Sequence, residues 1–512
     1  MALQEWFAGS HHQPGAPGLR ALLVSRDQWR SIAEDMAVAG ARLGPLWTSF
    51  TQDTGPLVHA AYLTHGSGLV LTLPLPDPDT PYPGIDDLFP AAARMQRAIT
   101  DLSGLRSTAT DARSWLSHEA WPQPYRPLID PPVSQFATEP TVSSYDFVRV
   151  EGDGVHEIAV GPVHAGTIEP GHFRFSVVGE KVLKLEERLG YVHKGIEQRF
   201  TQLPLFQGHR LAARVSGDSA VAFSWAYCQA LEGITNSELP ARAGWLRALY
   251  LELERIANHL GDLGALGNDA GFAFGLMQFG RLKEKLLRAS QEALGQRYLM
   301  DAIVPGGTAR DLSPLGIAAL GECIREIQRE AASLRTIYDE HAGLRDRFSG
   351  AGTVTPELAA RLGLTGLAGR ASGQSFDLRV DMPCELYREV PITKVVRSEG
   401  DVGARVAVRF DELRESSRFI QYLLGRLPEG AHRTSVRLPD EDALGVGLIE
   451  GWRGPVWIAL QAGPGGTIRR CHPHDPSWQN WPVLEHAIIG NIVPDFPLIN
   501  KSFNLSYSGH DL

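Results

Sequence analysis

The segment 161–175 places histidine and glutamate side chains among glycines and prolines, with the sequence GPVHAGTIEPGHFRF. Glu169 is the residue of this segment best suited to chemistry, because a carboxylate beside a cavity can accept and release protons. His164 and His172, and His193 further along the chain, are candidates for a direct role. A histidine beside glycines in a turn between strands is also commonly a hydrogen-bonded structural residue, so both interpretations stay open.

The four cysteines of the chain, Cys228, Cys323, Cys384 and Cys471, lie far apart. No two of them form a C-x-x-C pair, the arrangement that supplies thiolates to zinc and iron–sulfur centres. Cys228 lies in an apolar stretch at helical spacing, which favours a buried thiol. The cysteine pattern therefore predicts no metal site and a protein of a reducing compartment.

Composition excludes several classes of function. The chain has 512 residues and a net charge of -10, which argues against a nucleic-acid-binding protein. It contains no G-x-G-x-x-G motif, P-loop or G-x-S-x-G motif, so no dinucleotide or nucleotide site is predicted. No apolar run is long enough to span a membrane, and the N-terminus does not resemble a secretory signal. We therefore expect any membrane role to come through partner subunits.

The pattern of apolar residues and turn residues predicts an α+β fold in three segments. Residues 1–130 form a small domain of strands and helices, residues 131–144 a proline-rich linker, and residues 145–512 a mainly helical domain with peripheral strands. In this last domain we predict strands at 145–160 and 173–185, helices at 241–260, 281–295, 315–343 and 411–426, and a strand-rich region at 445–475 with a hairpin at 463–466.

The helix predicted at 241–260 has a clear periodicity. Its apolar residues recur at intervals of three and four, which is typical of an amphipathic helix. Its charged residues, which fall mostly at the other positions, are Arg242, Arg247, Glu252, Glu254 and Arg255.

Segment 161–175, together with RLGYVHKGIE at 188–197, resembles a known family. The similarity is to the large subunit of membrane-bound, energy-converting nickel–iron hydrogenases of the formate hydrogenlyase type, and to the quinone-site subunit of respiratory complex I. It continues through 240–264, 295–298 and 370–379. Residues 82–104 resemble the small hydrophilic subunit of complex I, which such hydrogenases carry fused at the N-terminus.

The resemblance implies a nickel–iron centre held by four thiolates from two C-x-x-C pairs, since soft sulfur donors select these metals. The first pair would lie at positions 216 and 219, which are Ser216 and Ser219 here, and Phe223 replaces a histidine of the same motif. The second would lie near the C-terminus, where residues 495–512 contain no cysteine. We therefore predict no bound nickel, iron or other cofactor in this chain.

The resemblance to the quinone-site subunit implies a tyrosine and a histidine that hydrogen-bond the quinone head. The aligned positions hold Gly217 and Pro170, and Leu299 replaces a further histidine. We therefore do not expect a quinone to bind in the manner of the relatives.

Several charged residues match positions that line the cavity of the relatives. Arg214 matches an arginine that approaches the terminal iron–sulfur cluster of a partner subunit, and Asp269 matches an acidic residue of the same cavity. Arg370, Asp377 and Arg379 are predicted to form a buried charge network, which is either a proton path or a structural ion cluster. Asp218, inside the altered loop, is a candidate proton acceptor of the cavity; it could equally point outward and have no chemical role.

The implied partners are an iron–sulfur small subunit with a 4Fe–4S cluster, antiporter-like membrane subunits and a membrane anchor, with the chain peripheral on the cytoplasmic face of the cell membrane. The first hypothesis is a metal-free component of an oxidoreductase complex, which couples electron transfer to a quinone or other acceptor with ion translocation. The alternatives are a redox-inactive scaffold and, least favoured, an active nickel–iron hydrogenase. A scaffold should fill the cavity that holds the metal in the relatives with apolar side chains, whereas a working site should keep polar groups there. Two of the residues expected at this cavity are apolar, Phe223 and Leu299. The others are polar: Ser216, Asp218, Ser219, Ser502 and Ser506.

Overall fold

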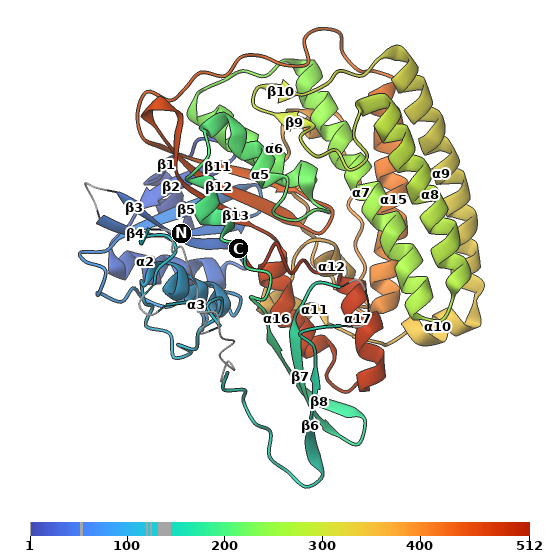
Figure 1. Ribbon diagram of the computed structural model, residues 1–512, viewed down its shortest axis with the longest axis horizontal. Helices are drawn as coiled ribbons and strands as arrows, with labels where there is room; N and C mark the ends of the chain where they lie inside the picture. Colours follow the sequence, from blue (N-terminus) through green and yellow to red (C-terminus); the bar gives the residue numbers. More distant parts are fainter. Residues whose placement is uncertain are drawn as a thin grey trace.

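The computed structural model describes residues 2–51, 55–118, 121–122, 125–131, 145–164, 166 and 168–512. The predicted α+β fold is confirmed, with a sheet-containing N-terminal part followed by a part dominated by long helices (Figure 1). After its first residue, the linker predicted at 131–144 lies outside the described residues. None of the described helices combines the length and the apolar character needed to cross a bilayer.

The N-terminal part consists of α1 (Ala2–Ala8), β1 (His11–His12), β2 (Leu19–Leu23), α2 (Arg26–Val38), β3 (Arg42–Thr51), β4 (Gly55–Thr64), β5 (Ser67–Pro74) and α3 (Ala92–Ser103). Its sheet has the order β1-β2-β5-β4-β3, with β2 and β5 parallel and the other pairs antiparallel. Side chains of β5 alternate between two cores, as the twofold period of a strand requires. Leu69 and Leu71 belong to the main core, whereas Val70 joins a second cluster with Trp457 of the C-terminal part.

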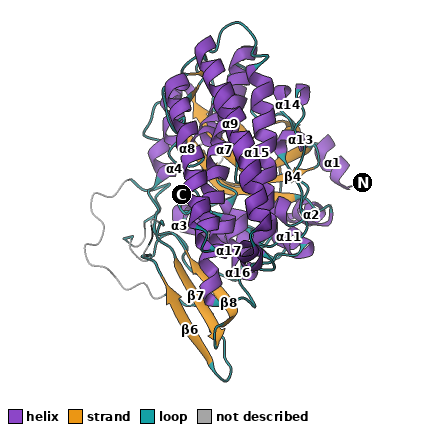
Figure 2. Ribbon diagram, turned by 90° about the vertical axis from the view of Figure 1, so that its right-hand side faces the viewer, coloured by secondary structure: helices purple, strands orange, loops and turns teal. Residues whose placement is uncertain are grey.

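A second sheet is formed by β6 (Val155–Val160), β7 (His172–Val178) and β8 (Lys181–Arg188), all antiparallel. It projects from the body of the molecule in both views (Figure 2). The strand predicted to begin at residue 145 begins only at Val155. The reason lies in Tyr145, whose ring stacks on the guanidinium groups of Arg188 and Arg113 at 4.5 and 4.8 Å. This segment is held by side-chain contacts of its aromatic residues rather than by strand pairing.

The central part contains α4 (Ile196–Phe200), α5 (Gly208–Ala212), α6 (Ala220–Ile234), α7 (Ala241–Asp269), α8 (Ala273–Leu294), β9 (Ile303–Val304), β10 (Gly307–Thr308), α9 (Pro314–Glu340), α10 (Ala342–Phe348), α11 (Pro356–Leu362), α12 (Gly366–Ala371), α13 (Leu378–Asp381), α14 (Glu385–Glu389) and α15 (Val402–Leu424). The four predicted helices are confirmed as α7, α8, α9 and α15, which stand side by side as a bundle (Figure 1). Side-chain caps define where two of them begin: Ser313 accepts the N–H of Gly316 at 3.1 Å, and Asp401 accepts that of Ala404 at 2.7 Å.

Charged residues of α7 are buried, which its amphipathic pattern did not predict. Arg247, Glu252 and Arg255 are completely inaccessible to solvent, and Glu254 is nearly so. Each charge is accommodated because it has a partner; for example, Arg247 makes two hydrogen bonds to Glu232, at 2.6 and 2.8 Å. A buried charge is tolerated when it is paired and hydrogen-bonded, so the whole circumference of this helix is packed.

The C-terminal part consists of β11 (Ala443–Glu450), β12 (Pro455–Gly463), β13 (Thr467–His474), α16 (Ser477–Ala487) and α17 (Phe496–Phe503). The three strands form an antiparallel sheet, covered by α6, and the predicted hairpin at 463–466 joins β12 to β13 (Figure 1). This sheet also contacts the N-terminal part, where Arg470 Nε donates to the carbonyl of Thr48 at 2.8 Å. The predicted strand-rich region at 445–475 is thereby confirmed, and it lies between the N-terminal sheet and the helices.

Candidate functional site

Two segments that are 290 residues apart in the chain meet at a pair of serine hydroxyls. The Oγ of Ser216, in the loop before α6, lies 2.9 Å from the Oγ of Ser506, in the loop after α17. The Ser506 hydroxyl also accepts the backbone N–H of Gly509 at 2.9 Å. Ser219 lies in the same loop as Ser216, and all three serines are buried. We call Ser216, Ser219 and Ser506 the serine cluster.

The carboxylate of Asp218 binds the serine cluster and a buried arginine. Ser216 Oγ donates to Asp218 Oδ1 at 2.6 Å and Ser219 Oγ does so at 3.3 Å. Arg453 Nη2 lies 2.5 Å from Asp218 Oδ2. Burial alone would raise the pKa of Asp218, but the Arg453 guanidinium and the serine hydroxyls outweigh it and hold the pKa below its usual value. Asp218 is therefore an ionised carboxylate that points into the site.

Arg453 connects the two segments of the site. Its Nε donates to the carbonyl of Asn504 at 2.6 Å, and its Nη1 lies 3.6 Å from Oδ2 of the fully buried Asp475. Burial raises the pKa of Asp475, although Arg453 acts in the opposite direction. The guanidinium thus supplies positive charge between two acidic groups and joins the 216–219 loop to the C-terminal segment.

The donor set at this site does not fit a nickel–iron centre. The positions that face each other carry hydroxyls, which are hard and weakly acidic and do not replace bridging thiolates. Three of the four cysteines are buried elsewhere as thiols: burial raises the pKa of Cys323 to about 11 and raises those of Cys228 and Cys471 still further. Within the described ranges, no group of three or more histidine, cysteine, aspartate or glutamate residues is arranged to hold a metal ion.

Glu254 is a second acidic group beside the serine cluster. It lines the same pocket as Asp218, and its carboxylate accepts the backbone N–H groups of Val221 at 2.7 Å and Ala222 at 3.3 Å, at the start of α6. Burial raises the pKa of Glu254 to about 8, although these two hydrogen bonds favour the ionised form. Near neutral pH, Asp218 and Glu254 therefore differ in protonation, which is the arrangement that proton transfer between two carboxyl groups requires.

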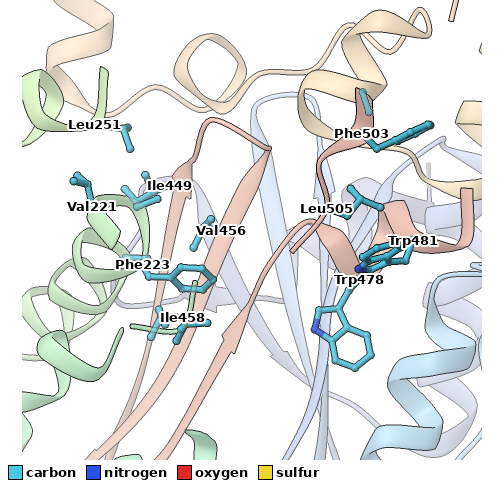
Figure 3. Packing of buried hydrophobic residues seen from close by; sticks show 14 of the residues in the cluster. Val221, Phe223, Leu251, Ile449, Val456, Ile458, Trp478, Trp481, Phe503 and Leu505 are labelled. Carbon is cyan, nitrogen blue, oxygen red and sulfur yellow. The ribbon is translucent and has the colours of Figure 1, made fainter. Parts of the chain in front are cut away.

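The position of the replaced histidine is apolar. Phe223 is completely buried, and its ring lies beside Ile458 and below Val456, from β12 (Figure 3). Leu299 is buried as well and lines the pocket that contains Asp218. The region that corresponds to the metal site of the relatives therefore has two parts. Hydroxyl and charged groups surround Asp218, and packed hydrocarbon surrounds Phe223.

Comparison with known proteins identifies the family. The model of the respiratory-chain NADH dehydrogenase 49 Kd subunit matches residues 269–444. Formate hydrogenlyase subunit 5 of Escherichia coli K12 is 30% identical over 438 residues, which cover 84% of this chain and 77% of that protein. The chain belongs to this family of 49 Kd-type and hydrogenase-related subunits.

Other relatives of the family agree with this assignment. The NADH-quinone oxidoreductase C/D protein of Bacteroides thetaiotaomicron is 28% identical over 431 residues, covering 80% of this chain and 81% of that protein. A solved chain of the membrane-bound sulfane sulfur reductase, an archaeal respiratory membrane complex, has the same fold: the TM-score is 0.66 at 24% identity, over 70% of this chain and 99% of that chain. The resemblance described from the sequence is confirmed, and the relatives are subunits of complex I-like and hydrogenase-related membrane complexes.

Arg214, the predicted cluster-facing residue, lies at the surface of the family fold. It makes a bidentate pair with Asp301, at 2.6 and 2.8 Å, and 45% of its side chain is exposed. The pair lies outside the serine cluster, although Arg214 begins the loop that carries it. The Arg214 guanidinium is thus held in one orientation at the surface.

The predicted charge network is present and is larger than the sequence suggested. Arg370 binds Glu412 at 2.7 Å and Glu450 at 2.8 Å, and it lies 3.8 Å from Asp377. Asp377 in turn binds Arg379 at 2.7 Å. All of these residues are buried, and the network also includes Glu252, Arg255 and His259 of α7. No hydrogen bond or ion pair of the described residues joins it directly to Asp218.

The glycine-rich segment approaches the C-terminal loop through Glu169. This residue is exposed, and its carboxylate accepts the backbone N–H of Ser508 at 3.2 Å. His164 and His172 instead bind carbonyls of their own turn, those of Gly171 at 3.0 Å and Gly161 at 3.1 Å. These contacts fit the interpretation of His164 and His172 as hydrogen-bonded structural residues.

The two remaining predicted residues lie apart from the serine cluster. His193 packs against Trp121, with ring centroids 5.3 Å apart. Asp269 is the last residue of α7 and is exposed, and partial burial raises its pKa. In the described part of the chain, no hydrogen bond or ion pair links either residue to Asp218.

Sequence reasoning did not find Arg453, Asp475 or Glu254 as site residues. Arg453 and Asp475 flank strands of the C-terminal sheet, and no motif spacing relates them to residue 218. In the sequence, Glu254 is only one charged position of a helix. The one available signal was the density of charge in the sequence LELER at 251–255, which is unusual for a helix that is otherwise so apolar.

Proposed function

We propose that this chain is the metal-free, large-subunit-like component of a hydrogenase-related, complex I-like membrane oxidoreductase complex. In this proposal it docks on an iron–sulfur subunit that holds a 4Fe–4S cluster, at the cytoplasmic face of the cell membrane. Antiporter-like and anchoring membrane subunits complete the complex. Electron transfer to a quinone or another acceptor is coupled to ion translocation.

The observation that carries the proposal is the ion pair of Arg453 with Asp218 over the serine cluster. A nickel–iron centre would bring positive charge to thiolates at this place, and the protein brings a guanidinium to a carboxylate instead. The site keeps ionisable groups, since Asp218 of the loop is charged and Glu254 of α7 has a pKa of about 8. This supports a site that handles protons without metal, and Glu169 and Asp269 are further candidates for the proton path.

The packing around Phe223 favours the second candidate, a scaffold or coupling subunit without redox chemistry. An inert subunit would fill the former cavity with hydrocarbon. Phe223 does so on one side, and Leu299 adds hydrocarbon to the pocket that contains Asp218. The two proposals differ in whether the ionisable side of the site takes part in turnover. Under the first, the buried network around Arg370 is a structural ion cluster and the acid–base groups are those of the Asp218 side.

Docking is tested at Arg214. Arg214 is largely exposed, and it makes an exposed ion pair with Asp301 and a hydrogen bond to the carbonyl of Arg210 one turn back. Arg214→Ala should therefore leave the fold intact, with a cost of about 1 kcal/mol or less. If Arg214 faces the partner cluster, losing the positive charge should lower the cluster's reduction potential by roughly tens of millivolts, or weaken assembly. Redox titration of the purified complex measures this effect.

Two control variants accompany the Arg214 experiment. Arg214→Lys keeps the charge and should stay near the wild-type potential. Arg288→Ala removes an exposed arginine of α8 that pairs with Glu284 and should change neither the potential nor assembly. Wild-type potential and wild-type assembly in Arg214→Ala would contradict the docking model.

A further inference from the structure

A pocket of about 140 Å³ opens beside the serine cluster, between α7 and α8. Leu253 and Glu254 of α7 form one wall. The opposite wall is a single face of α8, because its residues Lys283, Leu286, Leu287 and Ser290 are spaced by three, four and seven positions. Sites for small molecules have this character, with mostly apolar walls and a few polar groups.

Two polar groups of this pocket form neither a hydrogen bond nor an ion pair with any residue that the structure describes. Lys283 is half-buried, and its ammonium makes no hydrogen bond or ion pair with any described residue. Ser290 is 2% exposed, and its hydroxyl likewise has no partner in the described ranges. Buried serines in other helices bind a carbonyl one turn back, as Ser224 does to Ala220 at 2.6 Å and Ser417 to Leu413 at 2.7 Å. A buried hydroxyl left unpaired is costly, so the Ser290 hydroxyl is available to a ligand.

The charge of the pocket favours a monoanion. Arg297 at the rim is already paired with Glu284 at 2.6 Å, and the Asp218 carboxylate is engaged by Arg453. Glu254 carries its proton near neutral pH, since burial raises its pKa to about 8. Asp262 and Asp218 both attract the Lys283 ammonium, but Asp262 is itself paired with Arg409 at 2.9 Å. Lys283 therefore contributes a positive charge without an ion pair of its own among the described residues, although burial lowers the pKa of its ammonium. A ligand with one negative charge neutralises it, and a second charge would meet no partner.

The distance between Lys283 and Ser290 along α8 indicates how long a ligand that contacts both residues must be. Lys283 and Ser290 are seven residues apart, which is about 10 Å along a helix axis. Leu286 and Leu287 lie between them and present hydrocarbon. A fitting molecule has a carboxylate at one end, an apolar stem and a hydrogen-bonding group at the other end.

We propose that this pocket binds an elongated monocarboxylate with an apolar stem of about six carbons, whose carboxylate contacts Lys283 and whose far polar group contacts Ser290. The pocket also contains Asp218 and Glu254, on which the proposed function rests, but the binding proposal depends on Lys283 and Ser290 of α8, which have no part in that function. Binding can therefore succeed or fail without deciding the proposed function.

The test is calorimetric titration of the purified complex with ω-hydroxyhexanoate, hexanoate and hexylammonium. We expect the two carboxylates to bind and hexylammonium not to bind. Lys283→Met should weaken both carboxylates about tenfold or more, because a charged hydrogen bond is lost. Ser290→Ala should weaken ω-hydroxyhexanoate about threefold to tenfold and leave hexanoate unchanged.

Lys285→Met is the matched control, since Lys285 lies on the same helix but pairs with Glu326, outside the pocket. It should bind both carboxylates as the wild type does. Lys283 has no partner to lose, so its replacement should preserve the thermal unfolding temperature of the complex. Equal affinity of wild type and Lys283→Met, binding of hexylammonium as tight as hexanoate, or no heat from ω-hydroxyhexanoate at about 10 mM would each overturn the proposal.

Discussion

The free energy of unfolding of the wild-type chain is expected to fall by roughly 5 kcal/mol as the pH rises through neutrality, and replacing Glu254 with glutamine should abolish this fall. The pKa of Glu254 is about 8 in the folded chain, against an ordinary value of 4.5 for the unfolded chain. The folded state therefore holds one more proton between these two pH values, and the free energy of unfolding falls with rising pH in that window. Each pKa unit corresponds to about 1.4 kcal/mol, which gives the expected size.

The physical cause is burial, which no nearby charge offsets fully. Asp218 raises the pKa of Glu254 further, and Arg255 and the N–H groups of Val221 and Ala222 lower it. A glutamine at 254 keeps the shape of the neutral acid and has no charge to bury. Denaturant unfolding of both chains between about pH 5 and pH 9 measures the difference, because the other titrating groups are common to both. Parallel pH profiles of the two chains would contradict a raised pKa.

Replacing Arg453 with methionine is expected to lower the free energy of unfolding by about 3–5 kcal/mol. The substitution leaves the carboxylates of Asp218 and Asp475 without their shared cation, and Asp475 is completely buried. It also removes the hydrogen bond to the carbonyl of Asn504 that ties the C-terminal segment to the loop. Denaturant unfolding at neutral pH measures this loss.

Two further variants separate the charge from the size of the side chain. Adding Asp218→Asn to Arg453→Met should restore part of the stability, because one of the two unpaired carboxylates is then neutral. Arg214→Met, which breaks an exposed ion pair with Asp301, should cost less than about 1 kcal/mol. A similarly small loss for Arg453→Met would mean that the guanidinium does not hold the site together.

The sequence predicted the elements better than it predicted the site. Periodicity located α7, α8, α9 and α15, and the glycines of 463–466 located a hairpin, because both signals are local. The strand expected from residue 145 begins only at Val155, since Tyr145 binds arginines of other segments. The local pattern of apolar residues carries no information about contacts between side chains of distant segments.

Burial of charge explains most of what the sequence missed. The positions of Arg247, Glu252 and Arg255 looked polar in a helical pattern. Each is inaccessible to solvent, and a partner from another segment binds it: Glu232 binds Arg247, Arg379 binds Glu252, and the Glu450 carbonyl binds Arg255. Ser216 and Ser506 are 290 positions apart in the chain, so their contact depends on the whole fold. The family resemblance implied that these two segments belong to one site, but Arg453 could be recognised as its cation only from the folded chain.

We infer that hydroxyls and a guanidinium stand where a bimetallic centre would need thiolates. Nickel is the decisive element, because an iron–sulfur partner would contribute iron of its own. Elemental analysis of the purified complex, expressed as nickel per copy of this chain, tests the statement directly. We expect nickel at the level of the buffer blank, and a stoichiometric nickel ion in each chain would contradict the account.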